Sequence, residues 1–173
     1  MGRITFKEIY EIYVLGGQSA SKLIAPSDER FIPAEGGVYI VRPPKGFKVE
    51  FQKIPDGTRN VKGKELPNEY DTVVAKYDYL KKKGADLNVL YYGQASNLRR
   101  RLKEYAKFGY AHKGKNGKPF ENHAGGKLLW YVKNNKDLEV EFYAIKTYDI
   151  EERGLIREYH GIYYEFPLAN ERF

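Results

Sequence analysis

The sequence has no cysteine among its 173 residues, which excludes disulfide bonds and any zinc or redox site built on thiolates. His112 and His160 lack the spacing of zinc ligands, so we expect no zinc site. No apolar run approaches membrane-spanning length, and the first residues, MGRITFKEIYEIY, lack the apolar stretch of a secretory signal. Internal repeats and low-complexity segments are also missing. These absences indicate a soluble protein, which we expect in the cytoplasm.

The hydrophobic content is high enough for a folded core. Hydrophobic residues make up 42% of the chain and aromatic residues 15%, which excludes an intrinsically disordered protein. A chain of 173 residues fits one domain with a substantial core. We therefore interpret residues 1–173 as a single domain.

The positive charge is concentrated in one segment. The net charge is +7, and the segment from Arg99 to Lys127 holds nine Lys or Arg and only two Asp or Glu. The remainder of the chain is therefore neutral. A localised excess of this kind favours a surface that faces a polyanion. A solvated lysine-rich loop explains the charge equally well.

Hydrophobic patterning predicts three strands and several helices. Strands are expected where β-branched and aromatic residues run together or alternate with polar ones, at 36–41, 88–93 and 138–145. Helices are expected at 6–17, at 70–84, from 97 onward, at 127–135 and at 149–166. Residues 1–35 then form an N-terminal helical extension, and the Pro- and Gly-rich residues 43–88 form an insertion with one hairpin. This order indicates an α+β domain.

One arginine of the Arg99–Arg100–Arg101 run faces inward. Leu98, Leu102 and Tyr105 stand at i, i+4 and i+7 and form the buried stripe of the predicted helix. Arg101, at i+3, belongs to the same stripe, whereas its two arginine neighbours point elsewhere. Arg101 therefore needs a partner in the interior.

The last predicted helix repeats this pattern with the opposite charge. Its apolar stripe consists of Leu155, Ile156 and Tyr159, and Glu152 occupies the first position of that stripe. Burying either charge alone is unfavourable. The two residues could form a structural salt bridge. Alternatively, they line a cleft in which Arg101 meets a phosphate and Glu152 holds a metal ion.

The alternation of side chains along the predicted strands places tyrosines near Arg101 and Glu152. Tyr91 and Gly93 share one face of their strand, and Tyr92 points to the other. Gly37 and Tyr39 likewise share one face of the first strand. Gly93 removes side-chain bulk where the chain turns into the basic helix, so a ligand or another chain segment can approach.

Five short motifs follow one another in a specific order: GVY at 37–39, YYG at 91–93, NLRRRL at 97–102, ERGLI at 152–156 and PLAN at 167–170. In this order the chain resembles the GIY-YIG nuclease family over residues 35–170. The resemblance implies a small, three-stranded, mainly antiparallel sheet flanked by helices, with 43–88 inserted between the first two strands. Two positions depart from the common pattern: Tyr105 replaces a frequent histidine, as in the nuclease domain of bacterial nucleotide excision repair, and Gln94 stands where that domain often has lysine.

The resemblance implies a divalent-metal-dependent DNA endonuclease that uses one Mg²⁺ or Mn²⁺ ion, of either a restriction or mobile-element type or a repair or structure-selective type. The alternative is a catalytically inactive nucleic-acid-binding module. The implied roles are Tyr39 as general base, Tyr91 orienting the water or phosphate, Arg101 binding the phosphate, Tyr105 in place of the histidine, Glu152 holding the metal ion and Asn170 fixing the geometry. Because the ordinary pKa of a tyrosine is about 10, nearby cations would have to favour the Tyr39 phenolate.

Basic residues around the site are the expected DNA contacts, and His123 and Lys127 could also be merely solvated. They are Arg99, Arg100, Lys103, Lys113, Lys115, Lys118, His123 and Lys127. A restriction role would favour a homodimer, because cutting two strands takes two sites or two events.

Overall fold

The computed structural model describes residues 1–16, 24–54, 60–61, 64–65, 68–110 and 126–171. Four antiparallel strands form the central sheet in the order β1-β6-β2-β5. They are β1 (Gly2–Thr5), β2 (Gly37–Arg42), β5 (Tyr91–Ala95) and β6 (Glu139–Ala144). The α+β class is thus confirmed. The prediction of three strands is wrong, because the first residues, Gly-Arg-Ile-Thr, pair with β6 although so short a segment carries no strand pattern of its own.

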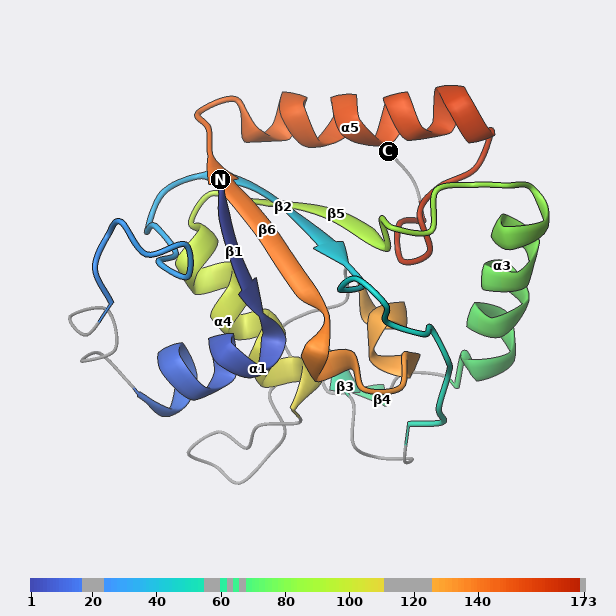
Figure 1. Cartoon of the computed structure of the whole chain (residues 1–173), viewed down its shortest axis with the longest axis horizontal. Helices are drawn as coiled ribbons and strands as arrows, with labels where there is room; N and C mark the ends of the chain where they lie inside the picture. Colours follow the sequence, from blue (N-terminus) through green and yellow to red (C-terminus); the bar gives the residue numbers. More distant parts are fainter. Residues whose placement is uncertain (17–23, 55–59, 62–63, 66–67, 111–125, 172–173) are drawn as a thin grey trace.

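Helices enclose the sheet from several sides (Figure 1). A short α1 (Phe6–Glu8) continues into the π-helix η1 (Ile9–Leu15), within the predicted 6–17 segment. The capping box of Thr5 and Glu8 ends β1 and starts α1. The other helices are α3 (Tyr70–Lys82), α4 (Leu98–Gly109), η3 (Lys127–Tyr131), η4 (Asn135–Asp137) and α5 (Tyr148–Tyr163).

Most predicted elements are present, with shifted ends. α3 ends before Gly84, whose φ of +68° is the left-handed conformation that favours glycine after a helix. The strand expected at 88–93 lies at Tyr91–Ala95. The helix expected at 127–135 is a 3-10 turn over Lys127–Tyr131. The hairpin expected in the insertion is the two-residue pair β3 (Asn60–Val61) and β4 (Lys64–Glu65).

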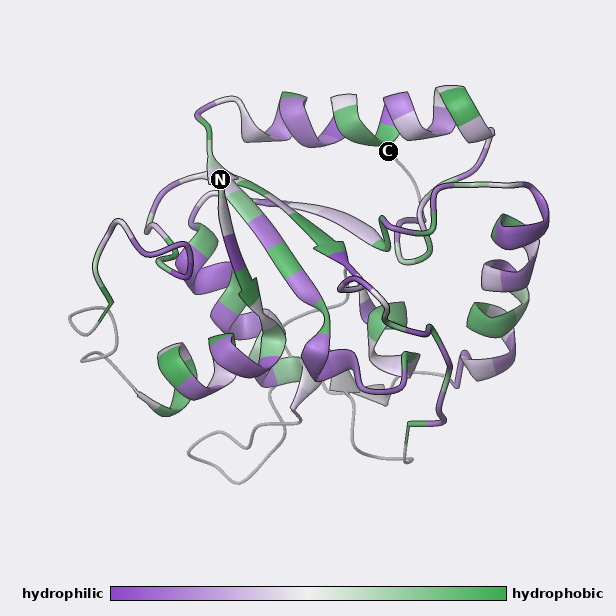
Figure 2. Cartoon of the chain, in the orientation of Figure 1, coloured by the Kyte–Doolittle hydropathy of each residue, from purple (hydrophilic) through white to green (hydrophobic). Residues whose placement is uncertain are grey.

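The two faces of the sheet have different coverings. α5 lies along one face, and α1 and α4 lie on the other side, as Figure 1 shows. β6 alternates hydrophilic and hydrophobic residues, visible as alternating colours in Figure 2, so Val140 and Phe142 are buried. On the opposite face, Arg42 and Glu141 form an ion pair of 3.3 Å. The edge strand β5 contacts both α4 and α5.

The start of α4 is fixed by local hydrogen bonds. The Asn97 side chain accepts from the backbone N–H of Arg100 at 2.9 Å, as an N-cap residue does. The N–H of Leu98 donates to the carbonyl of Glu35 at 2.8 Å. The predicted stripe of Leu98, Leu102 and Tyr105 is fully buried, which fixes the rotation of α4 and the direction of Arg101.

Candidate active site

Three tyrosines from three elements meet on the α4 face of the sheet. Tyr39 comes from β2, Tyr91 from β5 and Tyr105 from α4. The ring centroids of Tyr39 and Tyr91 are 6.0 Å apart, those of Tyr39 and Tyr105 6.3 Å, and those of Tyr91 and Tyr105 6.1 Å. The register brings the face of Tyr91 and Gly93 and the face of Tyr39 to the same side of the sheet, since Tyr39 pairs with Gly93 and Val41 with Tyr91.

The hydroxyl groups of these tyrosines are in different environments. The Tyr105 hydroxyl donates a hydrogen bond of 2.8 Å to the carbonyl oxygen of Gly126. The Tyr39 hydroxyl is buried and has no hydrogen-bond partner in the described parts of the chain. An unpaired buried hydroxyl is unfavourable by about 1–3 kcal/mol. Tyr39 therefore carries a buried polar group whose nearest polar neighbours are Arg101 and Tyr91.

Arg101 is the cation nearest to this tyrosine cluster. Its positive charge lowers the pKa values of Tyr39, Tyr91 and Tyr105. Its side chain is about one-third exposed, and its guanidinium lies 4.0 Å from the carboxylate of Glu104 one helical turn away. A pair this long and partly exposed contributes little stability. Arg101 is thus held loosely and remains open to an anion.

Glu152 approaches the cluster from α5. Its charge raises the pKa values of Tyr39 and Tyr91, so the carboxylate lies within electrostatic range of both phenols, although Arg101 acts more strongly on each. Burial raises the pKa of the Glu152 carboxyl itself. Among the residues that the structure describes, no ion pair joins Glu152 to Arg101. The alternative of a mutual structural salt bridge is therefore wrong.

The pKa of Tyr39 runs against the expectation of a phenolate. Burial raises the pKa of the Tyr39 phenol above its ordinary value, and the opposing effects of Arg101 and Tyr91 are smaller. Burial also raises the pKa values of Tyr91 and Tyr105 well above the ordinary value. Arg101 alone therefore leaves all three tyrosines protonated at neutral pH.

Glu152 is the best-placed metal ligand of the cluster. Within the described ranges, no group of three or more His, Asp or Glu residues could enclose a metal ion. A half-buried carboxylate with a raised pKa and no hydrogen bond to a described residue is nevertheless stabilised when a cation approaches it. The donor set fits a divalent ion held by one carboxylate, with its other ligands from outside the protein.

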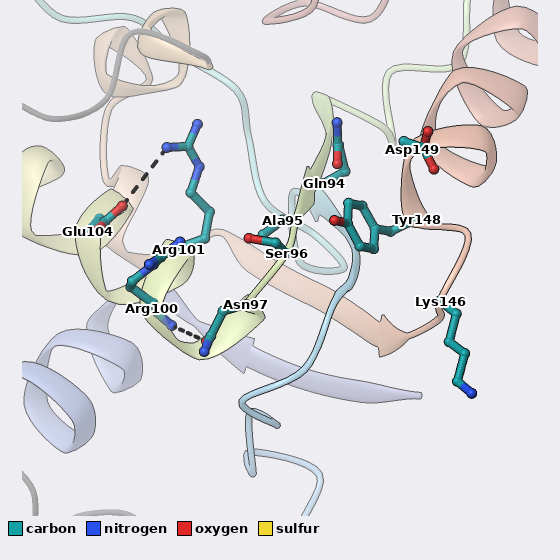
Figure 3. Close-up of a pocket in the computed structure, with 10 residues that line it drawn as sticks. All are labelled: Gln94, Ala95, Ser96, Asn97, Arg100, Arg101, Glu104, Lys146, Tyr148 and Asp149. Atoms are coloured by element: carbon teal, nitrogen blue, oxygen red, sulfur yellow. Dashed lines mark hydrogen bonds and ion pairs between the residues drawn. The ribbon is translucent and has the colours of Figure 1, made fainter.

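An open cleft of about 550 Å³ lies beside Arg101. Figure 3 shows Arg101 extending from α4 on one side and Tyr148 and Asp149 at the start of α5 on the other, with Gln94 between them. Arg100 and Lys146 also line the cleft. Sequence reasoning missed Lys146 and Tyr148, because the residues from the end of β6 to the first residue of α5 carry no motif.

Asn170 acts on the backbone of β5 instead of on the tyrosine rings. Its side-chain amide donates to the carbonyl of Tyr92 and accepts from the N–H of Tyr92, both at 2.9 Å. The exposed edge of β5 is thus paired as a further strand would pair it. Lys76 donates to the carbonyl oxygen of Asn170 at 2.8 Å and holds this segment in place. Asn170 therefore positions the strand that carries Tyr91 and Gly93.

The predicted DNA contacts separate into different groups. The Arg99 side chain donates to the carbonyl of Ile32 at 2.7 Å and lies over the Phe31 ring, so it is tied to the protein. Arg100 is exposed and Lys103 is partly buried. Lys127 forms an ion pair of 3.3 Å with Glu69, which contradicts a merely solvated side chain. The other four lie outside the described residues: Lys113, Lys115, Lys118 and His123.

Comparison with protein-family models, curated proteins and solved structures finds no match for the chain. Within the described part of the chain, no helix combines the length and the apolar character that crossing a membrane requires. The function is therefore inferred from the chemistry of one cluster of side chains. It consists of Tyr39, Tyr91, Tyr105, Arg101 and Glu152.

Proposed function

We propose that this protein is a divalent-metal-dependent DNA endonuclease of the GIY-YIG type, acting through a single Mg²⁺ or Mn²⁺ ion. The observation that carries the proposal is the buried, unpaired hydroxyl of Tyr39 beside the cation of Arg101 and the carboxylate of Glu152. These three groups come from β2, α4 and α5, and each belongs to a different one of the ordered motifs.

The topology supports the same proposal. β2, β5 and β6 carry or border the motifs, and the strand order β5-β2-β6 brings the GVY and YYG segments together as neighbours. The additional strand β1 lies at the opposite edge, next to β6, and adds nothing to the tyrosine cluster. An α+β sheet with this arrangement is compatible with the family that the motifs resemble.

Phosphodiester hydrolysis needs a bound phosphate, an activated water and help for the leaving oxygen. The planar guanidinium of Arg101 can hold two phosphate oxygens at once. In this proposal the Tyr39 hydroxyl would exchange a proton with the water that attacks the phosphate, and Tyr91, whose ring centroid lies 6.0 Å from that of Tyr39, would orient that water. The hydrogen bond from the Tyr105 hydroxyl to the carbonyl oxygen of Gly126 restrains the Tyr105 ring within the cluster. The cleft beside Arg101 offers Arg100 and Lys146 to the phosphates on either side.

Glu152 would hold the divalent ion. Bound there, the ion would cancel the carboxylate charge that raises the pKa values of Tyr39 and Tyr91 and would add positive charge beside the phosphate. The chain's own contribution is to bury the phenols, place Arg101 opposite them and keep Glu152 unpaired.

The test is cleavage of supercoiled plasmid and short duplexes with Mg²⁺, with Mn²⁺ and with chelator. We expect metal-dependent cleavage that Glu152→Gln and Arg101→Ala each reduce by about 10²–10³-fold. Glu151→Gln is the matched control, because Glu151 stands one position earlier on α5 and accepts a hydrogen bond from Tyr143 instead. Absence of cleavage of every DNA form, or full activity in Glu152→Gln, contradicts the proposal.

The same assay separates the remaining possibilities. Discrete fragments favour a restriction or mobile-element enzyme, and sedimentation would then be expected to reveal a homodimer. A preference for branched or damaged duplexes favours a repair or structure-selective enzyme. Binding without cleavage, weakening steeply with salt, identifies an inactive nucleic-acid-binding module.

A further inference from the structure

A second polar pocket, of about 290 Å³, lies away from the cleft beside Arg101. One wall comes from the start of the 43–88 insertion, the opposite wall from the segment around η4, and the remainder from the end of α4 and from η3. The lining residues are Gln52, Lys53, Ile54, Gly109, Tyr110, Trp130, Asn134, Asn135 and Lys136. The 43–88 insertion thus lines part of a pocket, which its sequence does not predict.

Backbone hydrogen bonds hold the two walls together. The N–H of Gln52 donates to the carbonyl of Tyr131 at 2.7 Å, and the N–H of Lys133 donates to the carbonyl of Glu50 at 2.8 Å. Phe51 and Val132 form an antiparallel bridge between these bonds. Main-chain pairing therefore holds the insertion segment of the pocket against the chain that follows η3.

The lining offers hydrogen bonds and positive charge. Within the described part of the chain, no carboxylate lines the pocket, and its polar side chains are the amides of Gln52, Asn134 and Asn135, the ammonium groups of Lys53 and Lys136, the hydroxyl of Tyr110 and the indole N–H of Trp130. Asn135 is only 7% exposed, and its Nδ2 donates to the carbonyl of Trp130 at 3.1 Å. No described residue donates a hydrogen bond to its Oδ1. An accessible acceptor that lines a cavity and has no partner among the described residues is suited to a ligand donor.

Lys136 is held at the rim. Its Nζ lies 4.4 Å from the centroid of the Tyr110 ring, and the Tyr110 ring stacks on Tyr10 with centroids 3.9 Å apart. This aromatic support limits the positions that the ammonium group can take. Lys136 therefore presents a positive charge at the pocket, next to the Tyr110 ring.

The pocket connects to the tyrosine cluster in two ways. Trp130, which lines the pocket, packs edge-on against Tyr105 with centroids 5.0 Å apart. The chain enters the lysine-rich segment 111–125 directly after Tyr110 at the pocket and leaves it at Gly126, whose carbonyl accepts the hydrogen bond from Tyr105. The basic segment thus begins at this pocket and ends at the candidate active site.

We propose that this pocket takes one base of the bound nucleic acid strand and that Lys53 and Lys136 hold the phosphate attached to it. Side-chain amides pair with base edges through their donor and acceptor groups. The volume, just below the range of pockets for drug-sized ligands, suits one base. The identity of the ligand rests on the proposed nuclease function. The insertion would then contribute base recognition to a nuclease domain.

The single tryptophan of the chain is a reporter in this pocket. We expect at least one of the four deoxynucleoside monophosphates, titrated without metal, to change Trp130 fluorescence saturably. Inorganic phosphate alone should leave the fluorescence unchanged. Gln52→Ala and the double variant Lys53→Ala/Lys136→Ala alter exposed side chains and should each weaken nucleotide binding about tenfold. Lys48→Ala is the control, because Lys48 is an exposed lysine of the same insertion that pairs with Glu50 and does not line the pocket, and this variant should bind the mononucleotide normally.

Three results would overturn the base pocket: equal responses to phosphate and nucleotides, no response to any nucleotide or to an eight-residue single strand, or unchanged binding in both pocket variants. The two proposals can fail separately. Saturable nucleotide binding in a protein that cleaves no DNA contradicts the nuclease but leaves the pocket. Metal-dependent cleavage without a nucleotide response at Trp130 contradicts the pocket but leaves the nuclease.

Discussion

The tip of the Tyr39 ring lies directly over Gly93, its partner in the β2–β5 register. A Cβ atom at position 93 would lie 2.5 Å from the Tyr39 hydroxyl oxygen. The hydroxyl can therefore stay in the interior of the site only because residue 93 has no side chain. We predict that Gly93→Ala displaces Tyr39, lowers the free energy of unfolding by about 1–3 kcal/mol and abolishes cleavage. Thermal unfolding and the plasmid assay measure the two effects.

Gly161→Ala is the control for this substitution. Gly161 lies within α5, and a Cβ there meets no atom within 4 Å. Alanine should stabilise the helix by about 1 kcal/mol and leave cleavage unchanged. Equal activity of Gly93→Ala and the parent protein would contradict the role assigned to the Tyr39 hydroxyl.

We predict opposite phenotypes for two neighbouring arginines. Arg99→Ala removes the hydrogen bond to Ile32 and the contact with Phe31, so it should lower the free energy of unfolding by about 1–2 kcal/mol. Arg100→Ala removes an exposed cation at the cleft and should leave unfolding unchanged. Its DNA affinity should fall, with a salt dependence reduced by about one counterion. Melting curves and salt-titrated fluorescence anisotropy distinguish the two variants.

Asn170→Ala tests how the edge of β5 is held. The substitution leaves the N–H and C=O of Tyr92 without their side-chain partners, and we predict a loss of about 2–3 kcal/mol in the free energy of unfolding. Asn68→Ala is the control, because Asn68 is exposed and accepts only from the N–H of Tyr70. Its cost should be about 0.5–1 kcal/mol. Similar losses in both variants would show that the Asn170 amide has no special role.

Glu152 predicts a pH-dependent stability. Burial raises its pKa in the folded state, so the folded protein retains a proton that the unfolded chain releases as pH rises. The stability that Glu152 contributes is present below its unfolded pKa and is lost as pH rises through the folded pKa. We predict that Glu152→Gln matches the parent protein near pH ~4 and exceeds it by about 0.5 kcal/mol near pH ~7, a small gain because the carboxylate is half exposed.

Unfolding measured across this pH range checks the sign. Mg²⁺ should stabilise the parent protein and not Glu152→Gln, since a bound ion favours the folded state. A parent protein more stable than Glu152→Gln at neutral pH without metal would mean that Glu152 has a stabilising partner in the fold.

The sequence pattern predicted the orientation of the cluster residues well. Helical spacing identified Arg101 as the inward arginine of α4. Period-two alternation grouped Tyr91 with Gly93 on one strand and Gly37 with Tyr39 on the other. Both inferences depend on local geometry alone. The partners of Arg101 could not be read in this way. Its nearest carboxylate is Glu104, three residues away, although spacing on two helices suggested Glu152.

Long-range pairing explains the other differences. The tie between Arg99 and Ile32, the Asn170 amide on β5 and the bridge from Phe51 to Val132 all join segments far apart in sequence. None of these three contacts produces a periodic pattern in the sequence. The pKa of Tyr39 is another such property, because complete burial depends on the packing of β2, β5 and α4 together.

The pairing of β1 with β6 also constrains how the fold is assembled. Gly2 stands opposite Phe142, so β1 has no strand to pair with in the sheet until the chain has been synthesised beyond residue 142. Contacts between such distant positions form late and slow folding. After β6 is made and before β1 pairs with it, β6 would present an open edge to other strands. Productive folding during synthesis therefore requires that β1 does not pair with another segment before β6 has been synthesised.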